Sequence, residues 1–261
     1  MCDCPSSAEI LVSVDRFVAT VTFSRPAKLN ALTPEMAATL IDVVDWCDRS
    51  NEVRVVVFTG AGEKAFSAGS DISTLASYAT PWDFRNRVDY CDAIRRSRKP
   101  AIAAINGYAL GGGLETALSC DIRIASERAH LGAPEIKLGW IGGGGMAALL
   151  SAAAGPSNAA LMLMTGEPIT AENAREWHLV SEVVPHEELL DRAREIAAIV
   201  ARRAPIAAET AKVNLRALAG MSVEQSLQYE RDLQAICFAT ADAREGRRAF
   251  AEKRDPTFTR S

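Results

Sequence analysis

Two glutamates beside a run of glycines are the residues whose types and spacing could do chemistry. The segment 106–115 passes through three consecutive glycines, Gly111–Gly113, to Glu115, and Glu135 follows Pro134 twenty positions later. Glycine lets a backbone approach a ligand closely, and N–H groups at the start of a helix can face a developing negative charge. Two carboxylates at such a place could take up and release protons beside an activated carbonyl group. The pattern therefore predicts acid–base chemistry on a carbonyl compound.

Strands that alternate with helices are expected to position these glutamates in the first two-thirds of the chain. Alternating apolar and polar residues at 9–24 predict a hairpin of two strands. Thr33 and Pro34 predict an N-cap and a helix start, and this helix is expected to reach about residue 48. Continuous apolar runs predict further strands at 53–59, 101–105 and 122–125.

Helices dominate the predictions for the rest of the chain. A loop is expected at 60–77 and a strand-like segment at 180–184. The predicted helices are 81–97, 113–120, 143–154, 158–164, 171–177, 187–203, 206–219 and 223–252. Because the last third of the chain is predicted to be helical only, a boundary is expected near Pro205.

The composition of the 261-residue chain is that of an ordinary soluble globular protein, with 48% hydrophobic and 24% charged residues. The net charge of −4 provides no overall basic field for nucleic acid. No apolar run approaches the roughly 18–20 residues of a membrane span, and the N-terminus lacks a secretory signal. We therefore expect a cytoplasmic protein with neither a nucleic-acid nor a membrane partner.

The six cysteines and three histidines do not have the spacing of a metal site. Cys2 and Cys4 could bind a metal, but no matching cluster of cysteines or histidines follows them, and a frayed tail is the other interpretation. The remaining cysteines are scattered and are expected to be free thiols. The sequence therefore predicts no metal site.

Five segments carry a resemblance to a known family. They are 25–32 (RPAKLNAL), 65–72 (AFSAGSDI), 99–121, 133–139 and the C-terminal 238–254, in the family's order over nearly the whole chain. On these segments the sequence resembles the enoyl-coenzyme A (CoA) hydratase/isomerase, or crotonase, family. The resemblance implies an α/β fold in which a spiral core of β-β-α turns, residues 1–204, holds an acyl-CoA site. It also implies a helical C-terminal region, residues 205–261, that packs on the core and on neighbouring subunits of a homotrimer or homohexamer.

The resemblance implies an acyl-CoA thioester as substrate and a role for four residues. The backbone N–H groups of Ser70 and Gly112 would bind the thioester oxygen as an oxyanion hole. Donors that are fixed before the reaction stabilise the charge that forms on this oxygen, and losing one donor typically costs roughly 2.7–4 kcal/mol. Glu115 and Glu135 would hold one water between them. Glu115 would activate this water for attack on the β-carbon, and Glu135 would deliver a proton to the α-carbon.

The same resemblance implies further contacts with the substrate. Arg25 and Lys28 lie in the loop that the family uses near the nucleotide, and carbonyl groups around Ala68 would meet the adenine. Lys253 could meet a phosphate, including one bound by an adjacent subunit. For Arg25 and Lys253, an ordinary surface cation is the alternative. The full set expected to bind substrate and CoA is Arg25, Lys28, Ala31, Ala68, Asp71, Ile72, Gly111, Trp140 and Lys253. No cofactor is implied beyond the CoA of the substrate.

The run Gly142–Gly145 departs from the family pattern, because Gly142 takes the place of a frequent proline. The run could bring backbone close to an unusual acyl group, or it could form a flexible pocket wall. It also fits the dinucleotide pattern GxGxxA, which would indicate an NAD-dependent oxidoreductase, but no βαβ unit with a following acidic residue is evident. Trp140 would either narrow the acyl pocket or lie in the core, and Trp82 and Tyr90 could shape the same pocket.

Both hydratase carboxylates are present, which in this family favours hydration or its reverse. We therefore predict an enzyme, an enoyl-CoA hydratase that reversibly adds water across the 2,3 double bond of its substrate. Double-bond isomerase, dehydratase or lyase chemistry, and a non-catalytic member that binds acyl-CoA, are the alternatives. A serine hydrolase is not indicated, because no GxSxG motif is present.

Overall fold

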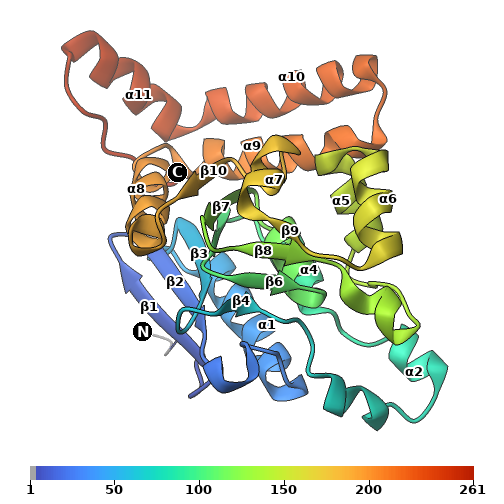
Figure 1. The fold of residues 1–261 in the computed structure, drawn as a ribbon. Coiled ribbons are helices and arrows are strands. Elements are labelled where there is room, and N and C mark those ends of the chain that lie inside the picture. Colours follow the sequence, from blue (N-terminus) through green and yellow to red (C-terminus); the bar gives the residue numbers. More distant parts are fainter. Residues whose placement is uncertain (1–3) are drawn as a thin grey trace.

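Two sheets form the centre of the computed structural model, which describes residues 4–261 (Figure 1). The six-stranded sheet has the order β1 (Ile10–Asp15), β2 (Val18–Phe23), β3 (Val55–Gly60), β5 (Ala101–Ile105), β7 (Ile122–Ser126) and β10 (Glu182–Val184). The four-stranded sheet has the order β4 (Ala65–Ser67), β6 (Tyr108–Leu110), β8 (His130–Gly132) and β9 (Ile169–Thr170). The pairs β1–β2 and β8–β9 are antiparallel, and the other neighbouring strands are parallel.

The chain visits the two sheets in turn. The strand pairs β3 and β4, β5 and β6, and β7 and β8 each contribute one strand to the large sheet and the next to the small sheet, and helices follow each pair. Asn106 holds the corner between β5 and β6, because its side-chain amide donates to the carbonyl oxygens of Gly60, Gly62 and Ala65. This repeated path confirms the predicted spiral of β-β-α turns.

Helices cover both faces of the large sheet, so β5 is apolar throughout and β3 is apolar from Val55 to Phe58. On one face, Val56 and Phe58 of β3 belong to a core cluster with α1 (Pro34–Arg49). On the other face, Val55 and Val57 pack in a cluster with α8 (Leu189–Ala201), which lies along the sheet in Figure 1. Successive strand residues point to opposite faces, which explains why a continuous apolar run forms this strand.

Most predicted helices are present with shifts of a few residues at their ends. These helices include α4 (Gly112–Ser119), α5 (Met146–Ala154), α6 (Pro156–Thr165) and α7 (Ala171–Glu176), and α9 (Pro205–Ala217) follows α8. The predicted start of α1 is confirmed, because the hydroxyl of Thr33 accepts a hydrogen bond from Met36 N.

Two predictions of single long helices are wrong, because each segment contains two helices. The segment 81–97 contains two helices, α2 (Pro81–Arg85) and α3 (Tyr90–Arg96), because the Asp89 carboxylate accepts from Cys91 N and begins a new helix. The segment 223–252 is divided into α10 (Val223–Ala239) and α11 (Ala241–Glu252). Thr240 ends the first of these helices and caps the second through Ala243 N.

Short elements were missed in segments predicted as loops or left unassigned. The predicted loop 60–77 contains β4 and a 3-10 helix, Ile72–Ser77. The three-residue strands β6 and β8 and the two-residue β9 have no sequence signal of their own. These strands form because the tertiary structure brings the backbones of neighbouring β-β-α turns together.

Buried charges join α9 to the core. Lys99, which is fully buried, pairs with Glu209 of α9 at 3.3 Å. Lys212 of α9 pairs with Asp121 at 2.9 Å and also donates to the carbonyl oxygen of Lys99. A buried charge is costly unless it is paired, so these contacts fix where the C-terminal helices begin. The predicted division between residues 204 and 205 stays a prediction.

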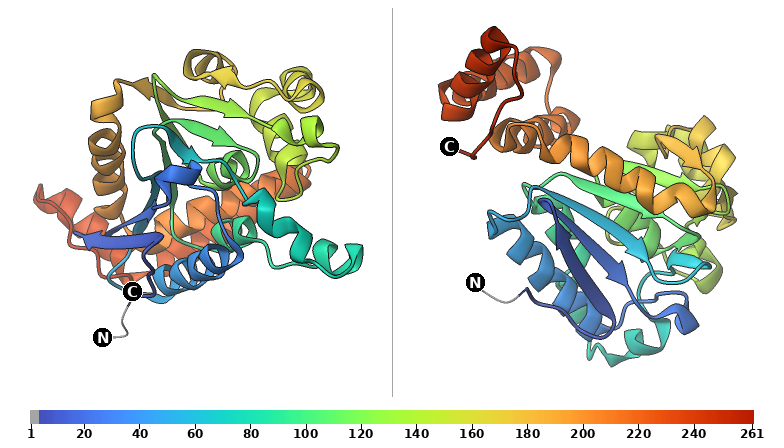
Figure 2. Two further views of the ribbon diagram at one scale, coloured as in Figure 1. Left: turned by 60° about the horizontal axis from the view of Figure 1, so that its bottom comes forward. Right: turned by 90° about the vertical axis from the view of Figure 1, so that its left-hand side faces the viewer.

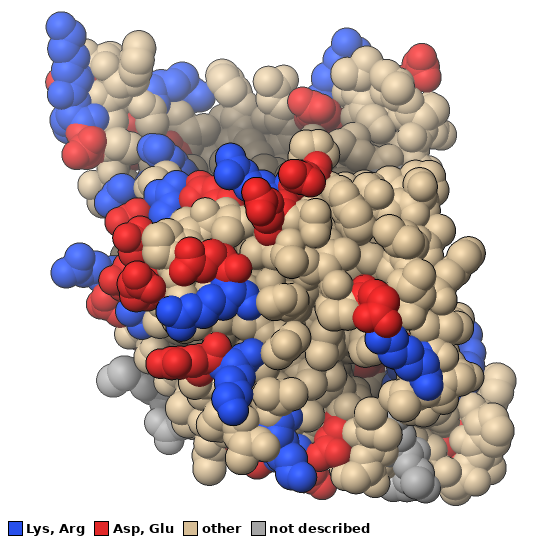
Figure 3. Space-filling model, viewed as in Figure 1, with Lys and Arg blue, Asp and Glu red and all other residues tan. Residues whose placement is uncertain are grey.

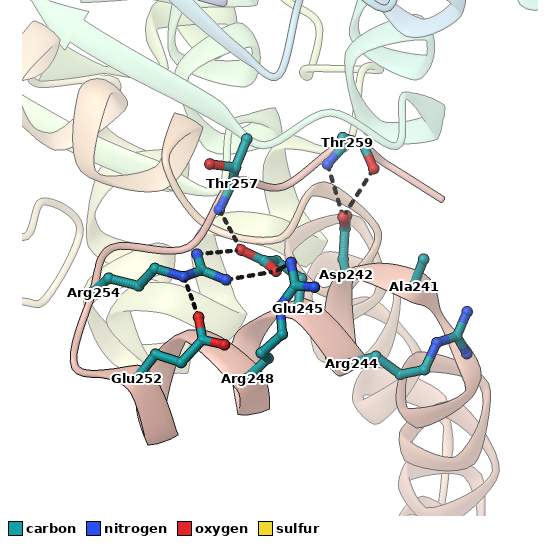
Figure 4. A pocket seen from close by; sticks show the side chains of 9 residues that line it. All are labelled: Ala241, Asp242, Arg244, Glu245, Arg248, Glu252, Arg254, Thr257 and Thr259. Carbon is teal, nitrogen blue, oxygen red and sulfur yellow. Dashed lines mark hydrogen bonds and ion pairs between the residues drawn. The ribbon is translucent and has the colours of Figure 1, made fainter.

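The helices α10 and α11 extend beyond the two sheets (Figure 2). The final segment folds back along α11, where Thr257 N and Arg254 bind Glu245 and Thr259 N binds Asp242 (Figure 4). A hollow of about 820 Å³ lies between them. Its charged walls are largely paired with one another, and none of the residues predicted for the site lines it.

Charged side chains of both signs are interspersed over the left part of the face shown in Figure 3, and the right part is largely uncharged. None of the helices within residues 4–261 combines the length and the apolar character of a membrane-spanning segment. Within the same residues, no cluster of histidine, cysteine and acidic side chains has the arrangement of a metal site. Cys2 lies outside the described residues, and Cys4 is a free thiol.

Candidate active site

A cavity of about 320 Å³ lies where four segments of the chain meet. The segments are the loop after β4, the end of α2, the start of α4 and the residues that follow β8. The predicted site residues that line it are Ala68, Ser70, Ile72, Gly111, Gly112, Glu115, Glu135 and Trp140. The structure therefore brings both glutamates and both predicted backbone donors to one cavity. Phe84 and Arg87 also line it and were not among the predicted site residues.

Glu115 is held in α4 and is almost completely buried, with 6% of the residue exposed. Its Oε1 accepts hydrogen bonds from Gly144 N at 2.7 Å and from Met146 N at 3.2 Å. Burial raises the pKa of Glu115, the negative charges of Asp89 and Glu135 raise it further, and the two N–H donors partly offset these effects. A carboxylate with a raised pKa is suited to exchange protons near neutral pH.

The glycine run 142–145 forms the cradle of this carboxylate. A Cβ atom added to Gly142 would lie 2.8 Å from Oε1 of Glu115, and one added to Gly144 would lie 2.6 Å from its Oε2. Only glycine lets the backbone approach the carboxylate so closely. The dinucleotide interpretation is not supported, because a 3-10 helix (Pro134–Leu138) precedes the run where the motif requires a strand.

Glu135 reaches the cavity from this 3-10 helix. Its Oε1 would lie 3.2 Å from a Cβ atom placed on Gly111, so the side chain faces the start of α4. Its Oε2 is buried and has no hydrogen-bond partner among the described residues. Burial raises the pKa of Glu135, and a backbone hydrogen bond partly offsets the effect. An unpaired buried oxygen costs about 1–3 kcal/mol, so this atom is available to a reacting group.

The N–H groups of Ser70 and Gly112 lie side by side. A Cβ atom added to Gly69 would lie 2.5 Å from Gly112 N, and one added to Gly112 would lie 3.4 Å from Ser70 N. Gly112 is the first residue of α4, where N–H groups have no acceptor within the helix. Neither of the two N–H groups has an acceptor within residues 4–261. They can therefore donate to one oxygen of a ligand.

Tyr90 packs directly behind these two donors. Its hydroxyl lies 3.4 Å from Ser70 Oγ, and a Cβ atom added to Gly112 would lie 2.3 Å from it. Burial raises the pKa of Tyr90 well above its usual value, so the hydroxyl stays protonated. Trp82, by contrast, is 72% exposed and does not line the cavity. Trp140 is 40% exposed and forms part of the cavity wall, so it is not a core residue.

The other residues predicted to bind CoA lie outside the cavity lining. Arg25 donates to the carbonyl oxygen of Ala31 and forms an ion pair with Asp71 at 2.7 Å. Hydrogen bonds from Ser73 and Arg25 lower the pKa of Asp71 to about 2. This pair holds together the two loops that flank the cavity. Lys28 is exposed, as is Lys253 at the end of α11, and the CoA contacts of this group stay predictions.

Comparisons with known proteins show the family of the chain. A family model described as enoyl-CoA hydratase/isomerase matches residues 14–261. The 2,3-dehydroadipyl-CoA hydratase of Escherichia coli is 37% identical, covering 96% of this chain and 98% of its own length. The short-chain-enoyl-CoA hydratase of Clostridium acetobutylicum is 37% identical, covering 94% of this chain and 95% of its own. The crystal structure of an enoyl-CoA hydratase from Bacillus anthracis superposes with a TM-score of 0.90 at 35% identity, covering 97% of this chain and all of its own. The chain therefore belongs to the enoyl-CoA hydratase/isomerase family.

Proposed function

We propose that this chain is an enoyl-CoA hydratase that adds water reversibly across the 2,3 double bond of an enoyl-CoA thioester. The observation that carries the proposal is the meeting of Glu115 and Glu135 beside the unpaired N–H groups of Ser70 and Gly112 in one cavity. Two relatives that are 37% identical over nearly the whole chain are named as a 2,3-dehydroadipyl-CoA hydratase and a short-chain-enoyl-CoA hydratase, which supports the same reaction.

The proposed reaction forms one C–O bond and transfers two protons. Glu115 as a carboxylate takes a proton from water while the water oxygen bonds to the β-carbon. Glu135 in its protonated form gives its proton to the α-carbon, and the product is a 3-hydroxyacyl-CoA. One proton leaves the water and one enters the substrate, so exchange with solvent restores both glutamates. The β-carbon is formally oxidised and the α-carbon formally reduced by the same amount, so the reaction needs no oxidant or reductant, and we propose that CoA acts only as part of the substrate.

The two backbone donors act on the thioester oxygen. Attack at the β-carbon moves electrons through the conjugated system and places negative charge on this oxygen. Ser70 N and Gly112 N already lie beside one another, so they stabilise this charge without reorganisation. The aligned peptide dipoles at the start of α4 add to the effect at Gly112.

The two glutamates must be in opposite protonation states when the substrate is bound. Burial raises the pKa of both carboxyl groups, and the charge of Glu135 raises the pKa of Glu115 further. One shared proton is therefore favoured over two negative charges. The N–H groups of Gly144 and Met146 favour the ionised form of Glu115. The oxygen of Glu135 without a protein partner favours Glu135 as the carrier of the proton.

A homo-oligomer is proposed from the surface of α10. None of the residues of α10 is buried, and it exposes Leu227, Ile236 and Phe238. Apolar side chains grouped on one element favour packing against another subunit. We propose a trimer or hexamer in which Lys253 meets a CoA phosphate bound by an adjacent subunit, and a cytoplasmic location.

The proposal is tested with the purified protein and crotonyl-CoA. Loss of the absorbance of the conjugated thioester should accompany formation of 3-hydroxybutyryl-CoA, identified by its mass gain of one water. Starting from 3-hydroxybutyryl-CoA, the same enzyme should reach the same ratio of the two thioesters. Tight binding of several 2-enoyl-CoA thioesters without turnover of any would contradict the proposal and favour a binding protein. Migration of the double bond without added water would favour an isomerase.

A further inference from the structure

The cavity contains a cation that the proposed hydration does not use. Among the described residues that line the cavity, Arg87 is the one lysine or arginine, and its side chain is 26% exposed. It stands opposite the glycine run, because a Cβ atom added to Gly143 would lie 3.0 Å from its Nη2. Gly143 precedes Gly144, whose N–H holds Glu115. The guanidinium therefore lies beside the residue that precedes Gly144 in the Glu115 cradle.

The contacts of Arg87 fix its position and leave most of its donors free. The guanidinium carbon lies 4.3 Å from the centre of the Phe84 ring, and Nη1 donates to the carbonyl oxygen of Phe84 at 2.9 Å. Asp89 is the nearest opposite charge, at 3.9 Å from Nη2, which is too long for a hydrogen bond. An arginine has five N–H donors, and within residues 4–261 only one of them is used. A preorganised guanidinium with free donors is suited to bind a carboxylate with two hydrogen bonds.

The residues around Arg87 determine which ligand its positive charge can favour. The other charged residues of the cavity lining are Glu115 and Glu135, so an anionic acyl group would be repelled there without a cation. Trp140 and Ile141 add apolar surface to the same cavity. From these positions we propose that Arg87 is a specificity-determining residue that binds a carboxylate carried by the acyl group, a few carbon atoms beyond the reacting double bond.

This inference rests on the proposed function, because it names the class of acyl group that the same site accepts. The preferred substrate is the CoA thioester of an unsaturated dicarboxylic acid, and a neutral acyl group of equal length is the poorer one. An alternative role for Arg87 is purely structural, since its bond to Phe84 satisfies a carbonyl at the end of α2. A structural role would affect all substrates alike, and a binding role would affect only those with the carboxylate.

The test compares 2,3-dehydroadipyl-CoA with 2-hexenoyl-CoA, which have six-carbon acyl chains with and without a terminal carboxylate. We expect the ratio of their kcat/KM values to favour the dicarboxylic substrate in the wild type. In Arg87→Gln this ratio should fall roughly 10- to 100-fold, as expected for loss of a charged hydrogen bond. The matched control is Arg85→Gln. Arg85 is exposed at the end of α2, two residues before Arg87, and among the described residues its side chain bonds only Asn86, so the ratio should stay within about twofold of the wild type. An unchanged ratio in Arg87→Gln, or an equal loss on both substrates, would overturn the inference.

A binding measurement separates this inference from the proposed function. Adipyl-CoA and hexanoyl-CoA lack the double bond, so their affinities, measured by calorimetry, do not depend on turnover. We expect adipyl-CoA to bind at least tenfold more tightly to the wild type, with the preference lost in Arg87→Gln. If adipyl-CoA binds no more tightly than hexanoyl-CoA, the carboxylate site is refuted even where crotonyl-CoA is hydrated. If the preference is present and no enoyl-CoA is hydrated, the proposed function fails and the carboxylate site stands.

Discussion

Replacing Gly144 with alanine tests the cradle of Glu115. The added Cβ atom would lie 2.6 Å from Oε2 of Glu115, 3.0 Å from its Cδ and 3.3 Å from Asp89 Oδ2. The first of these distances is about 1 Å shorter than an ordinary contact between carbon and another heavy atom. The carboxylate and the backbone must therefore move apart, which weakens the 2.7 Å bond from Gly144 N. A displacement of about 1 Å at a reacting group can cost roughly 10²-fold in rate.

We expect kcat for crotonyl-CoA to fall on the order of 100-fold in Gly144→Ala, with KM changed only a few-fold. The assay is the loss of thioester absorbance, combined with thermal unfolding of each variant to check the fold. Gly220→Ala is the matched control, because a Cβ atom there meets nothing within 4 Å. A kcat within threefold of the wild type in Gly144→Ala would refute the idea that the glycine run positions Glu115.

Three further predictions concern the surroundings of the site. Asp89→Asn removes a negative charge that raises the pKa of Glu115. The acidic limb of the pH profile of kcat/KM should therefore move to lower pH. A limb that stays in place or moves to higher pH would count against Glu115 as the base. Tyr90→Phe should lower kcat by roughly 2- to 10-fold, since its 3.4 Å contact with the oxyanion loop is weak, and a loss above 100-fold would indicate a direct role. Glu209→Gln leaves Lys99 buried without its charged partner, so the free energy of unfolding measured in urea should fall by about 3–5 kcal/mol. A fall below about 1 kcal/mol would contradict the stabilising role of this buried ion pair.

The central elements of the fold could be predicted because their sequences carry local signals. The apolar run of β3 reflects burial on both faces, and the cap at Thr33 marks the start of α1. Elements of three residues, such as β6 and β8, are too short for any periodicity to show. The break at Thr240 was missed because a single capping threonine inside a helical pattern is a weak signal, and tertiary packing decides its use.

The main residues of the site could be predicted from sequence motifs, and the residues that position them could not. Glu115, Glu135 and the glycines before α4 were identified from motifs, and the structure places them around one cavity. The role of the run at 142–145 was left open, because it depends on how closely this segment approaches a helix that lies about thirty residues earlier in the chain. Arg87 was missed for a similar reason. Its segment was predicted as the middle of one helix, and the break before Asp89 turns it toward the cavity.

The most direct test of the central claim is the rate of crotonyl-CoA hydration by Glu115→Gln and Glu135→Gln, measured beside the affinity for a saturated acyl-CoA. Each variant should lose roughly 10²- to 10⁴-fold in kcat, the usual contribution of a general acid or base, and keep its affinity within a few-fold. Glutamine preserves the shape of both side chains, and the exposed Glu127→Gln serves as the matched control. Near-normal kcat in either glutamate variant would contradict the shared roles of the two carboxylates.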